Sequence, residues 1–598
     1  MRTTPRPRYD VIIMGGGPAG STLGALLART SNLSVCILEK EVFPREHIGE
    51  SFAHPMIPVL EESGALGKVL DSDCWVKKYG GIFNWDADAP RVAFFDHANW
   101  ANDGVHRWAM HVNRSEFDHI LLDHAADSGV DVFQGTSVHA FEPHAGDLAG
   151  GCVVTLKNGQ RIHGSYFVDA SGRRNSIAAK QKRSWLSGYR NIAIWQHFLG
   201  GEFVQDLPAE WNVFHGPRYS PIGCFAFPDG WCWYIPVPKI VDGRRQITHS
   251  IGIVTIPAVL KESGKDFTDQ ATFMKTVKQV PLLRDLIGDI RPIAPKMATA
   301  TNYSMINERF ANLDERWILI GDASYFVDPL FSSGVAFATN QAASASLVLR
   351  QTLEGGLTDQ DTRDLWRDYD EGWHGMAETF ALSIDQWYQT IGKNNPDSIY
   401  WHHRGSSVDL GIQENTFDAL LNTAFTPDLL QVMTGGSGEL SDLDADGAYA
   451  TAATQADPGE PHPGAAVTLA PGATVRAGVG LDVPGFKAFI PPAPFALSAP
   501  AKAAIAEYWK DPIANGDATP SPTTEPVPCQ RFCLGAGPDA VEIRGLDRDG
   551  AAELAAALRE PVAYGTLRDR LGLPQVQLLK RLLRAGIVTV ADEALRAA

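Results

Sequence analysis

Residues 11–20 read VIIMGGGPAG, a run of four apolar residues followed by three glycines and by a fourth glycine at position 20. The apolar run predicts a short buried strand. Gly15, Gly17 and Gly20 fit the pattern G-x-G-x-x-G. In that pattern the first glycine makes a tight turn, the second lets the backbone approach a pyrophosphate, and the third lets helix and strand pack closely. The stretch therefore predicts a strand, a turn and a helix that bind a dinucleotide.

The next residues complete this unit. The segment STLGALLAR at 21–29 has helical spacing, and residues 33–38 form a second β-like run that ends in Glu39. Glu39 lies 19 residues beyond Gly20, where a carboxylate should hold the hydroxyl groups of a ribose. The pyrophosphate would lie at the N-terminus of the helix, where free N–H groups and the helix dipole favour an anion. We therefore expect a dinucleotide-binding βαβ unit.

The whole chain predicts an α/β (α+β) fold with a long C-terminal extension. The segments IAIWQHF, WCWYIPVP and HSIGIVTI alternate aromatic and β-branched residues, which is typical of an antiparallel sheet. A later apolar run at 317–320 precedes a helical stretch from 335 to about 352. We therefore expect a discontinuous Rossmann-like domain at 1–184 and 290–352, which includes part of the substrate sheet near 75–110. An antiparallel-sheet substrate domain at 185–289 is inserted into it. The C-terminal extension should comprise a helical segment at 353–433, an acidic Gly/Ala/Pro-rich linker or cover at 434–500, and a winged-helix-like module at 501–598.

Composition narrows the possible functions. The 598 residues carry 52 Lys and Arg against 70 Asp and Glu, a net charge of −18, which argues against binding to nucleic acids or anionic membranes. No apolar run has the length of a membrane span. Seven scattered cysteines argue against a disulfide framework, and no Cys or His cluster has zinc spacing, so we expect no metal site. A short apolar stretch near the N-terminus is unlike a secretory signal, so we expect a cytoplasmic protein.

Three further segments lie in the order found in flavin monooxygenases. NRSEFD at 113–118, followed by HILLDHA, fits R-x-x-F-D-x-x-L-L, while FVDASGR at 167–173 and IGDA at 320–323 fit the two later motifs. Residues 8–350 therefore resemble the p-hydroxybenzoate-hydroxylase-like flavoprotein monooxygenase superfamily. The resemblance implies that the first domain binds FAD. The residues that it implies as FAD ligands are Gly15, Gly17, Ala19, Gly20, Glu39, Lys40, Arg45, Ser51, Arg114, Asp322, Pro329, Gly334 and Val335.

Two features resemble flavin-dependent halogenases within this superfamily. Residues 231–236, WCWYIP, match the W-x-W-x-I-P signature, and on a strand Trp231 and Trp233 share one face, where two indoles could separate flavin from substrate. Lys78, two residues before Gly80, fits a lysine that the family carries before a glycine-containing strand. Its ammonium could hydrogen-bond hypohalous acid, or its amine could form a haloamine. Lys77 is the alternative candidate.

A second loop and a second carboxylate are also similar to the halogenases. The loop DPLFSSGV at 328–335 resembles the one that presents backbone N–H groups beside the flavin, and the resemblance assigns halide binding to Ser333 and Gly334. Phe331 stands where tryptophan halogenases have Glu, which argues against free tryptophan as substrate. Glu50, in HIGES at 47–51, is either a catalytic base or a loop carboxylate without a catalytic part.

The resemblance is to halogenases of phenols, pyrroles and carrier-bound acyl groups, and the C-terminal extension resembles that of the chloramphenicol-pathway halogenase. It implies an oxidoreductase of antibiotic biosynthesis that uses FADH2, O2 and chloride or bromide. A single dinucleotide fingerprint favours a separate flavin reductase as electron source. The substrate is a small molecule or a group tethered to a carrier protein, and one candidate docking site is the basic run Arg173, Arg174, Lys180, Lys182 and Arg183. The alternative function is an FAD-dependent aromatic or polyketide hydroxylase that uses NAD(P)H.

Overall fold

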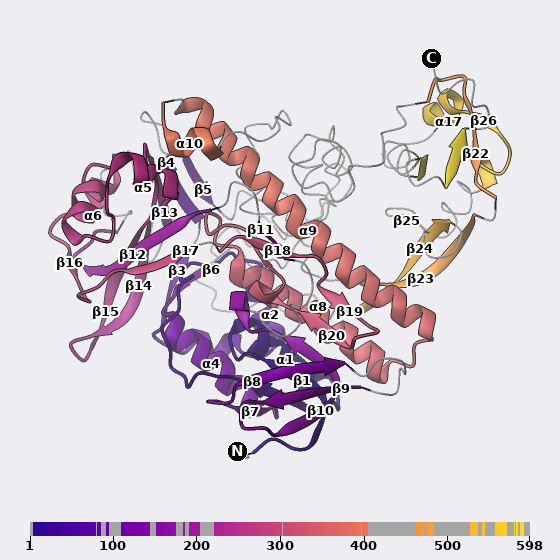
Figure 1. The fold of residues 1–598 in the computed structure, drawn as a ribbon, viewed down its shortest axis with the longest axis horizontal. Helices are drawn as coiled ribbons and strands as arrows, with labels where there is room; N and C mark the ends of the chain where they lie inside the picture. The colour runs from indigo at the N-terminus through magenta and orange to yellow at the C-terminus, as the bar shows by residue number, and fades with distance from the viewer. Residues whose placement is uncertain are drawn as a thin grey trace, which may run out of the picture. The chain divides into compact units, whose positions relative to one another are not determined.

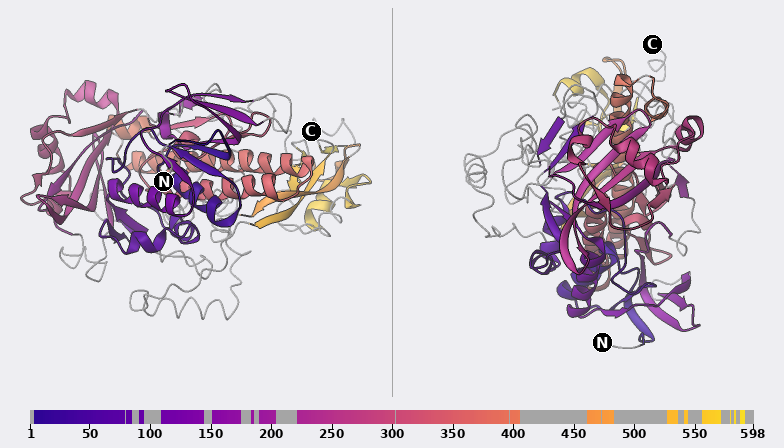
Figure 2. Two further views of the ribbon diagram at one scale, coloured as in Figure 1. Left: turned by 90° about the horizontal axis from the view of Figure 1, so that it is seen from below. Right: turned by 90° about the vertical axis from the view of Figure 1, so that its left-hand side faces the viewer.

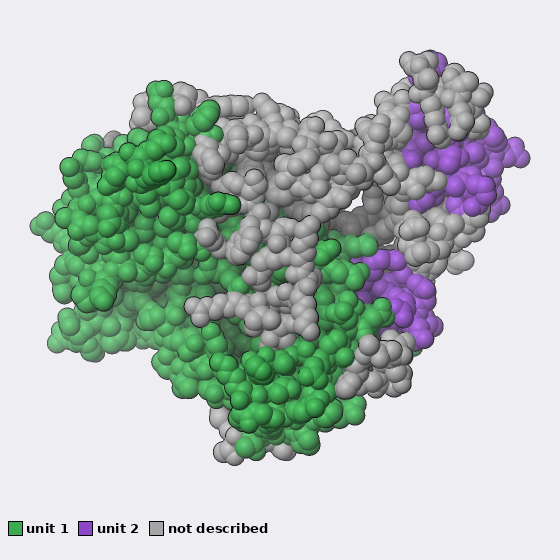
Figure 3. Space-filling model, in the orientation of Figure 1, with its two compact units in different colours: residues 1–356, 369–436, 483–526 green, residues 357–368, 437–482, 527–598 purple. Residues whose placement is uncertain are grey.

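The chain forms two compact units in a computed structural model (Figure 3). Unit 1 comprises residues 1–356, 369–436 and 483–526, and unit 2 comprises residues 357–368, 437–482 and 527–598. The structure describes residues 4–78, 80–84, 91–94, 109–143, 151–174, 183–185, 190–203, 221–301, 303–395, 397–404, 461–471, 473–482, 527–535, 541–543, 556–570, 579, 582–583 and 587–590.

An eight-stranded mixed sheet forms around the N-terminal strand of unit 1 (Figure 1). Its strand order is β19-β20-β10-β1-β2-β7, with β9 beside β10 and β8 beside β9. The central pairs, β1 with β10 and with β2, are parallel. The strands are β1 (Arg8–Met14), β2 (Val35–Leu38), β7 (Asp131–Phe133), β8 (Val138–Pro143), β9 (Cys152–Leu156), β10 (Arg161–Asp169), β19 (Ala311–Asn312) and β20 (Trp317–Leu319).

Burial explains why the first strand is apolar without alternation. Val11, Ile12 and Ile13 are all fully buried, as expected for a parallel strand that is covered on both faces. The crossover from β1 to β2 is α1 (Pro18–Thr30), which contacts α4 (Arg114–Asp127) and α8 (Gly334–Glu354). The βαβ unit expected from the glycine pattern is thus present, with the glycine turn between β1 and α1.

The second sheet of unit 1 is built mainly of antiparallel strands. Its order is β16-β12-β15-β14-β13-β4-β5, with β17 beside β12, and only β13 and β4 pair in parallel among its described strands. The strands are β4 (Gly80–Asn84), β5 (Arg91–Phe94), β12 (Ile192–Leu199), β13 (Ile222–Phe227), β14 (Gly230–Val241), β15 (Arg244–Thr255), β16 (Arg291–Pro292) and β17 (Ala298–Thr301).

The two faces of this sheet differ in what they carry. One face packs its apolar residues, such as Cys232, Tyr234 and Ile253, against the helices α5 (Pro257–Ser263), α6 (Gln270–Val277) and α7 (Leu283–Leu286). Figure 2 shows α5 and α6 beside the magenta strands from two further sides. The opposite face carries Trp231 and Trp233, and we call it the indole face.

The remaining elements of unit 1 join these two sheets. Strand β14, which carries both tryptophans, contacts β3 and β6. Helices α8 and α9 are in contact through aromatic rings, with the rings of Phe337 and Phe380 4.9 Å apart. These elements are α2 (Met56–Glu62), α3 (Leu66–Leu70), β3 (Trp75–Lys78), β6 (Ala109–Val112), β11 (Arg183–Trp185), β18 (Met305–Asn307), β21 (Tyr325–Phe326), α9 (Asp359–Asn394) and α10 (Ile399–Arg404). The first part of α9, residues 359–368, belongs to unit 2.

Two small sheets form among the described residues of unit 2. The orders are β26-β22-β27 and β23-β24-β25, and the first sheet shares a core with α17 that includes Val467, Tyr564 and Leu567. The elements are β22 (Ala466–Leu469), β23 (Thr474–Asp482), β24 (Val527–Gly535), β25 (Val541–Ile543), β26 (Val562–Ala563), α17 (Tyr564–Arg570) and β27 (Val588–Val590). Most of 434–500 and 501–598 lies outside the described residues, so the linker and the winged-helix-like module stay predictions. Within the described ranges, no helix is both long and apolar enough to cross a bilayer.

A buried histidine in the helix-covered face predicts acid sensitivity. His249 is 2% exposed, its ring stacks on Tyr234 at 4.6 Å, and burial lowers the pKa of His249 to about 4. The unfolded chain therefore binds the proton more tightly, and the folded state loses stability as the pH falls from about 6.5 towards 4. Denaturant unfolding at pH 7 and at pH 4.5 measures this loss as a difference between two free energies of unfolding. We expect that difference to be about 2–3 kcal/mol smaller in His249→Phe than in the wild type. His402→Phe, at an exposed position, is the control, and an equal loss in both variants would contradict the prediction.

Candidate active site

The glycine turn has the close contacts that the sequence pattern predicts. Gly15 has a positive φ of 110°, and a Cβ atom on Gly15 would lie 2.4 Å from the carbonyl oxygen of Ala170. A Cβ on Gly20 would lie 2.0 Å from the carbonyl oxygen of Gly15. Larger side chains would therefore separate α1 from β1. The N-cap of α1 is Gly17, so the first free N–H groups of the helix follow the turn.

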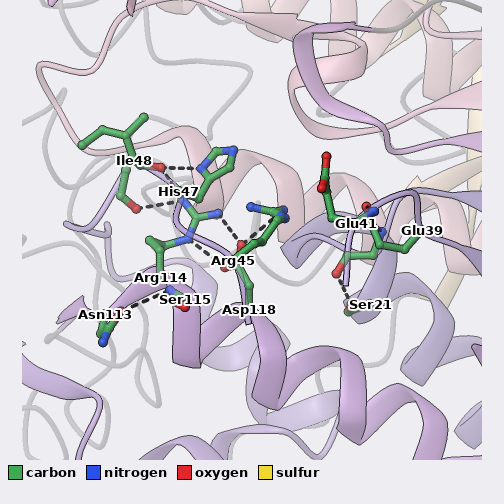
Figure 4. A network of polar contacts seen from close by, with 12 residues as sticks. Ser21, Glu39, Glu41, Arg45, His47, Ile48, Asn113, Arg114, Ser115 and Asp118 are labelled. Carbon is green, nitrogen blue, oxygen red and sulfur yellow. Dashed lines mark hydrogen bonds and ion pairs between the residues drawn. The ribbon is translucent and has the colours of Figure 1, made fainter. Parts of the chain in front are cut away.

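Glu39 follows β2 and holds the turn from the opposite side. Its two carboxylate oxygens accept the backbone N–H groups of Gly16, at 2.7 Å, and of Glu41, at 2.8 Å. Ser21 donates its hydroxyl to the carbonyl of Gly16 at 2.8 Å, and this bond is drawn in Figure 4. A carboxylate has about four acceptor sites, so both oxygens can still accept ribose hydroxyls.

Two arginines meet at one aspartate beside the turn (Figure 4). Arg114 donates to both carboxylate oxygens of Asp118, at 2.7 and 2.9 Å, and to the carbonyl of Ile48 at 2.7 Å, so it fixes the loop at residues 48–49. Nη2 of Arg45 lies 3.5 Å from Oδ2 of Asp118. The same Nη2 lies beside the glycine turn, because a Cβ atom added to Gly17 would be 3.6 Å from it. Nη1 of Arg45 is buried without a hydrogen-bond partner among the described residues. Arg45 is therefore placed to donate to a phosphate in the turn.

The later motif places Asp322 against the same helix. Asp322 lies in the 3-10 turn Gly321–Ala323, and burial raises the pKa of its carboxyl group. A Cβ on Gly321 would lie 3.2 Å from the Cβ of Ala19, in the first turn of α1. Lys40 is instead exposed and forms an ion pair with Glu41 at 3.6 Å. The tight turn, the helix N-terminus, the two carboxylates and the Arg45 donor fit a bound FAD.

Lys78 is the buried member of the lysine pair. It is fully buried on β3, where Nζ donates to the Ser51 hydroxyl at 2.9 Å and to the Phe52 carbonyl at 2.8 Å. Burial lowers the pKa of Lys78 to about 7, so both the ammonium and the amine are populated at neutral pH. Lys77 is only partly buried and, as its neighbour on a strand, lies on the opposite face.

The loop before α8 reaches the same serine. Ser332 has a positive φ of 58°, which is unusual for a serine, and its hydroxyl donates to that of Ser51 at 3.1 Å. Pro329 accepts the backbone N–H of Ser332 at 3.1 Å. Ser333, which is buried, is the N-cap of α8, and Gly334 and Val335 form its first turn. The structure therefore brings the predicted halide loop and Lys78 together through Ser51.

The register of the second sheet shows which residues share the indole face with Trp231 and Trp233. Residues paired on neighbouring strands point to the same side of a sheet. Trp233 pairs with Cys224 on β13 and with Gly252 on β15, and Gly252 pairs with Trp195 on β12. The ring of Trp233 lies 6.3 Å from that of Trp231. The two tryptophans of the signature therefore belong to a row of aromatic groups on the indole face, which also includes Trp195, 6.2 Å from Trp233.

Sequence reasoning missed a tyrosine that links this row to the loop at 328–335. Trp231 donates its Nε1–H to the hydroxyl of Tyr388 at 3.0 Å, and Tyr388 donates to Asp328 at 3.2 Å. Asp328 also accepts the backbone N–H of Leu330 at 3.0 Å and so shapes the loop. Tyr388 lies 157 residues from Trp231, on α9, and no local motif marks it.

Glu50 lies at the edge of the indole face. Its carboxylate is buried, and Oε1 is 2.6 Å from Nε2 of His197 on β12. Burial alone would raise the pKa of Glu50, but the charge and hydrogen bond of His197 lower it below its ordinary value. Lys239 and the Ser250 hydroxyl act in the same direction. Glu50 is therefore an ionised carboxylate inside the protein, which the sequence alone could not decide.

Gly252 tests the placement of Trp233. A Cβ at this position would lie 2.1 Å from Cζ2 of the Trp233 indole. We expect Gly252→Ala to push this ring out of its place, which changes the near-UV circular dichroism and costs about 1–3 kcal/mol of stability. Gly67→Ala is the control, because nothing lies within 4 Å of its Cβ. Unchanged spectra in Gly252→Ala would contradict this arrangement of the face.

A family model and two relatives relate the chain to halogenases. The family model described as tryptophan halogenase matches residues 85–416. A 1H-pyrrole-2-carbonyl-[peptidyl-carrier protein] chlorinase of Pseudomonas fluorescens is 31% identical over 404 residues, which are 64% of this chain and 82% of that protein. A tryptophan 2-halogenase of Chondromyces crocatus is 28% identical over 395 residues, 65% of this chain and 69% of that protein.

Solved structures show the same fold. The flavin-dependent halogenase CmlS matches 98% of this chain and 96% of its own, with a TM-score of 0.62 and 24% identity. The myxobacterial chondrochloren halogenase CndH, an FAD-dependent enzyme, matches 74% of this chain and 96% of its own, with a TM-score of 0.57 and 25% identity.

Proposed function

Because the chain belongs to the tryptophan halogenase family of flavin-dependent halogenases, we propose that it uses FADH2 and O2 to make hypohalous acid, which Lys78 delivers to carbon. The carbon belongs to an electron-rich phenol or pyrrole, or is otherwise activated. The proposal places the reaction in antibiotic biosynthesis and in the cytoplasm. The halide is chloride or bromide.

One observation carries this proposal. The Lys78 ammonium, the Ser51 hydroxyl and the Ser332 hydroxyl form a buried chain with successive distances of 2.9 and 3.1 Å. These hydrogen bonds connect the loop that is proposed to hold the halide with the lysine that is proposed to hold hypohalous acid. Ser51 follows directly on the loop that Arg114 fixes beside the dinucleotide turn. These contacts support a path from the proposed cofactor site through the proposed halide loop to Lys78.

The residues have separate tasks along that path. FAD, held by the glycine turn, Glu39, Arg45 and Asp322, would supply with O2 the oxidising equivalents that convert halide into hypohalous acid. Ser333 and Gly334, at the positive end of α8, would hold the halide anion. Lys78 would hold hypohalous acid by a hydrogen bond or as a haloamine. The indoles of Trp231 and Trp233 would keep the organic substrate away from the flavin.

The loop at 328–335 also bears on the substrate. Phe331 is buried, and its ring lies 6.4 Å from that of Phe83 on β4. A benzyl group at this position cannot pair with the ammonium of a free amino acid, whereas it can line a pocket for an arene. This supports a phenolic or pyrrolic substrate over free tryptophan. The carrier-protein chlorinase among the relatives supports a tethered substrate as well.

The basic run after β10 stays the proposed docking site for a carrier protein. Among its described members, Arg173 has its guanidinium 5.9 Å from the centre of the Tyr303 ring. Lys180 and Lys182 lie outside the described residues. Arginine near an aromatic ring can still bind a phosphate through its planar edge.

The electron source distinguishes this proposal from its alternative. The chain carries one G-x-G-x-x-G fingerprint, and we therefore propose a separate flavin reductase as partner. The test follows bleaching of monochlorodimedone by hypohalous acid, with FAD, NADH, bromide and a flavin reductase, and with each left out in turn. We expect bleaching only with all four. NAD(P)H oxidation without reductase and halide would favour an aromatic or polyketide hydroxylase instead.

A further inference from the structure

The amide of Asn191 lies beside the loop at 328–335, and the structure uses only its nitrogen. Nδ2 of Asn191 donates to Oδ2 of Asp328 at 3.1 Å. Asp328 also accepts hydrogen bonds from the Leu330 N–H and the Tyr388 hydroxyl, so it acts as an acceptor. The amide nitrogen must therefore face Asp328, and the amide oxygen points elsewhere.

That oxygen has nothing to bind within the described ranges of the chain. Asn191 is fully buried, and its Oδ1 atom has no hydrogen-bond partner there. An unsatisfied buried acceptor costs about 1–3 kcal/mol, and native folds leave few of them. A fold retains such an atom most readily where a bound ligand supplies the missing donor.

The register of the second sheet places Asn191 on the indole face. Ala193 on β12 pairs with Val254, and Val254 pairs with Trp231, so these residues share one face. Ile192 packs against the core on the opposite, helix-covered face. Side chains alternate along a strand, so Asn191 returns to the face of Ala193. The unused acceptor therefore belongs to the face that carries both signature tryptophans.

The partner of this amide lies near the lysine of the proposed reaction. Cys224 pairs with Trp233 and so shares the indole face. Burial raises the pKa of the Cys224 thiol, and the charge of Lys78 lowers it while the charge of Asp328 raises it further. Because the interaction between charges weakens with distance, both charged groups lie near Cys224. Lys78 and the Asn191 amide are therefore neighbours of the same part of the indole face.

We propose that Oδ1 of Asn191 accepts a hydrogen bond from a ring O–H or N–H group of the substrate and so positions the arene while Lys78 presents the halogen. The substrate class is then phenols or pyrroles in which this donor is free. Asn191 is a substrate-binding residue that determines specificity, because a methylated donor would leave Oδ1 buried and unpaired. The inference rests on the proposed function and names the group of the substrate that the enzyme recognises.

The test compares each donor with its methylated form. Resorcinol is paired with its dimethyl ether, and methyl pyrrole-2-carboxylate is paired with its N-methyl derivative. Each is incubated with enzyme, FAD, NADH, flavin reductase and bromide, while free methionine consumes hypobromous acid that leaves the enzyme. For each pair, the ratio of kcat/KM for the free donor to kcat/KM for the methylated form is measured.

We expect Asn191→Leu to lower this ratio by about tenfold relative to the wild type, since one hydrogen bond to the substrate is lost. The change should lie mainly in KM, because the bond is made in the bound substrate as well as in the transition state. A fall confined to the resorcinol pair identifies an O–H donor, and a fall confined to the pyrrole pair identifies an N–H donor.

Three further variants separate recognition from effects on the loop. Tyr388→Phe removes another hydrogen bond to Asp328 but keeps the Asn191 amide, so both members of a pair should respond equally and the ratio should stay at its wild-type value. Asn158→Leu, in the exposed turn between β9 and β10, is the matched control and should change neither rate. Asn191→Ala removes the amide without adding bulk and should repeat the effect of Asn191→Leu. The flavin spectrum of each variant reports whether it is folded.

Four outcomes count against the account, and they differ from one another. A wild-type ratio in both Asn191 variants excludes the amide as the acceptor. Loss of FAD binding, or of monochlorodimedone bleaching without methionine, in both variants assigns Asn191 to the flavin instead. A wild-type enzyme that makes hypobromous acid but brominates no member of either pair contradicts the inference and leaves the proposed function intact. A wild-type enzyme that makes no hypobromous acid contradicts the proposed function itself.

Discussion

Lys78→Met is expected to abolish halogenation and, at the same time, to stabilise the protein at neutral pH. The loss of activity follows because methionine can neither donate a hydrogen bond to hypohalous acid nor form a haloamine. We expect arene bromination to fall by about 10²–10³-fold. FAD binding should stay unchanged, since Lys78 is not among the residues expected to hold FAD. Lys77→Met, on the opposite side of the same strand, is the control and should keep its activity.

The gain in stability follows from the pKa of the buried amine. The pKa of Lys78 falls from 10.5 to about 7 on folding, so the unfolded chain binds the proton more tightly and the folded state loses stability as pH falls from about 10.5 to 7. At pH 7 this costs about 4 kcal/mol. Methionine removes that cost but leaves two acceptors without their donor, which costs about 1–3 kcal/mol. We therefore expect a net gain of about 1–3 kcal/mol at pH 7 that shrinks towards pH 10.

Denaturant unfolding at pH 7 and pH 9.5 measures this gain. A Lys78→Met variant that is less stable at both pH values would show that the amine is held by favourable contacts and not by the needs of catalysis. A variant with wild-type halogenation would remove Lys78 from the reaction path.

Gly20→Ala is expected to abolish FAD binding. The added methyl group would lie 2.0 Å from the Gly15 carbonyl oxygen, a contact that can be relieved only when α1 moves away from β1. The helix N-terminus and the tight turn, which together would hold the pyrophosphate, then no longer face the same point. We expect FAD affinity to fall by at least about 100-fold, roughly 3 kcal/mol.

The measurement is the flavin spectrum of the purified protein and its titration with FAD. Gly67→Ala is again the control, because its added methyl group meets nothing within 4 Å. A yellow Gly20→Ala protein with wild-type affinity would show that FAD binds elsewhere in the chain.

Local sequence patterns were sufficient for the first βαβ unit and for the glycine turn. The run at 11–14 and the spacing of Gly15, Gly17 and Gly20 determine both the strand and the close contacts around it, because these depend on neighbours within a few residues. The alternation in WCWYIPVP likewise predicted a strand with both indoles on one face, which the register of β14 confirms.

The rest of the site depends on contacts between distant segments. The sequence favours Lys78 over Lys77 only through its spacing to Gly80, whereas the packing of β3 against the rest of unit 1 buries Lys78 and leaves Lys77 partly exposed. Tyr388 and His197 carry no motif, since each acts on a group more than a hundred residues away. Glu39 was expected to hold a ribose, and its additional bond to the N–H of Gly16 depends on how the turn folds back over β2.

The proposed function requires this chain to form a carbon–halogen bond rather than a carbon–oxygen bond. Mass spectrometry of the product made from resorcinol tests it, with FAD, NADH, flavin reductase, bromide and isotopically heavy O2. We expect a product with the bromine isotope doublet and without heavy oxygen, and no such product from Lys78→Met. A product that carries heavy oxygen and no bromine, formed equally well without halide, would instead identify a hydroxylase.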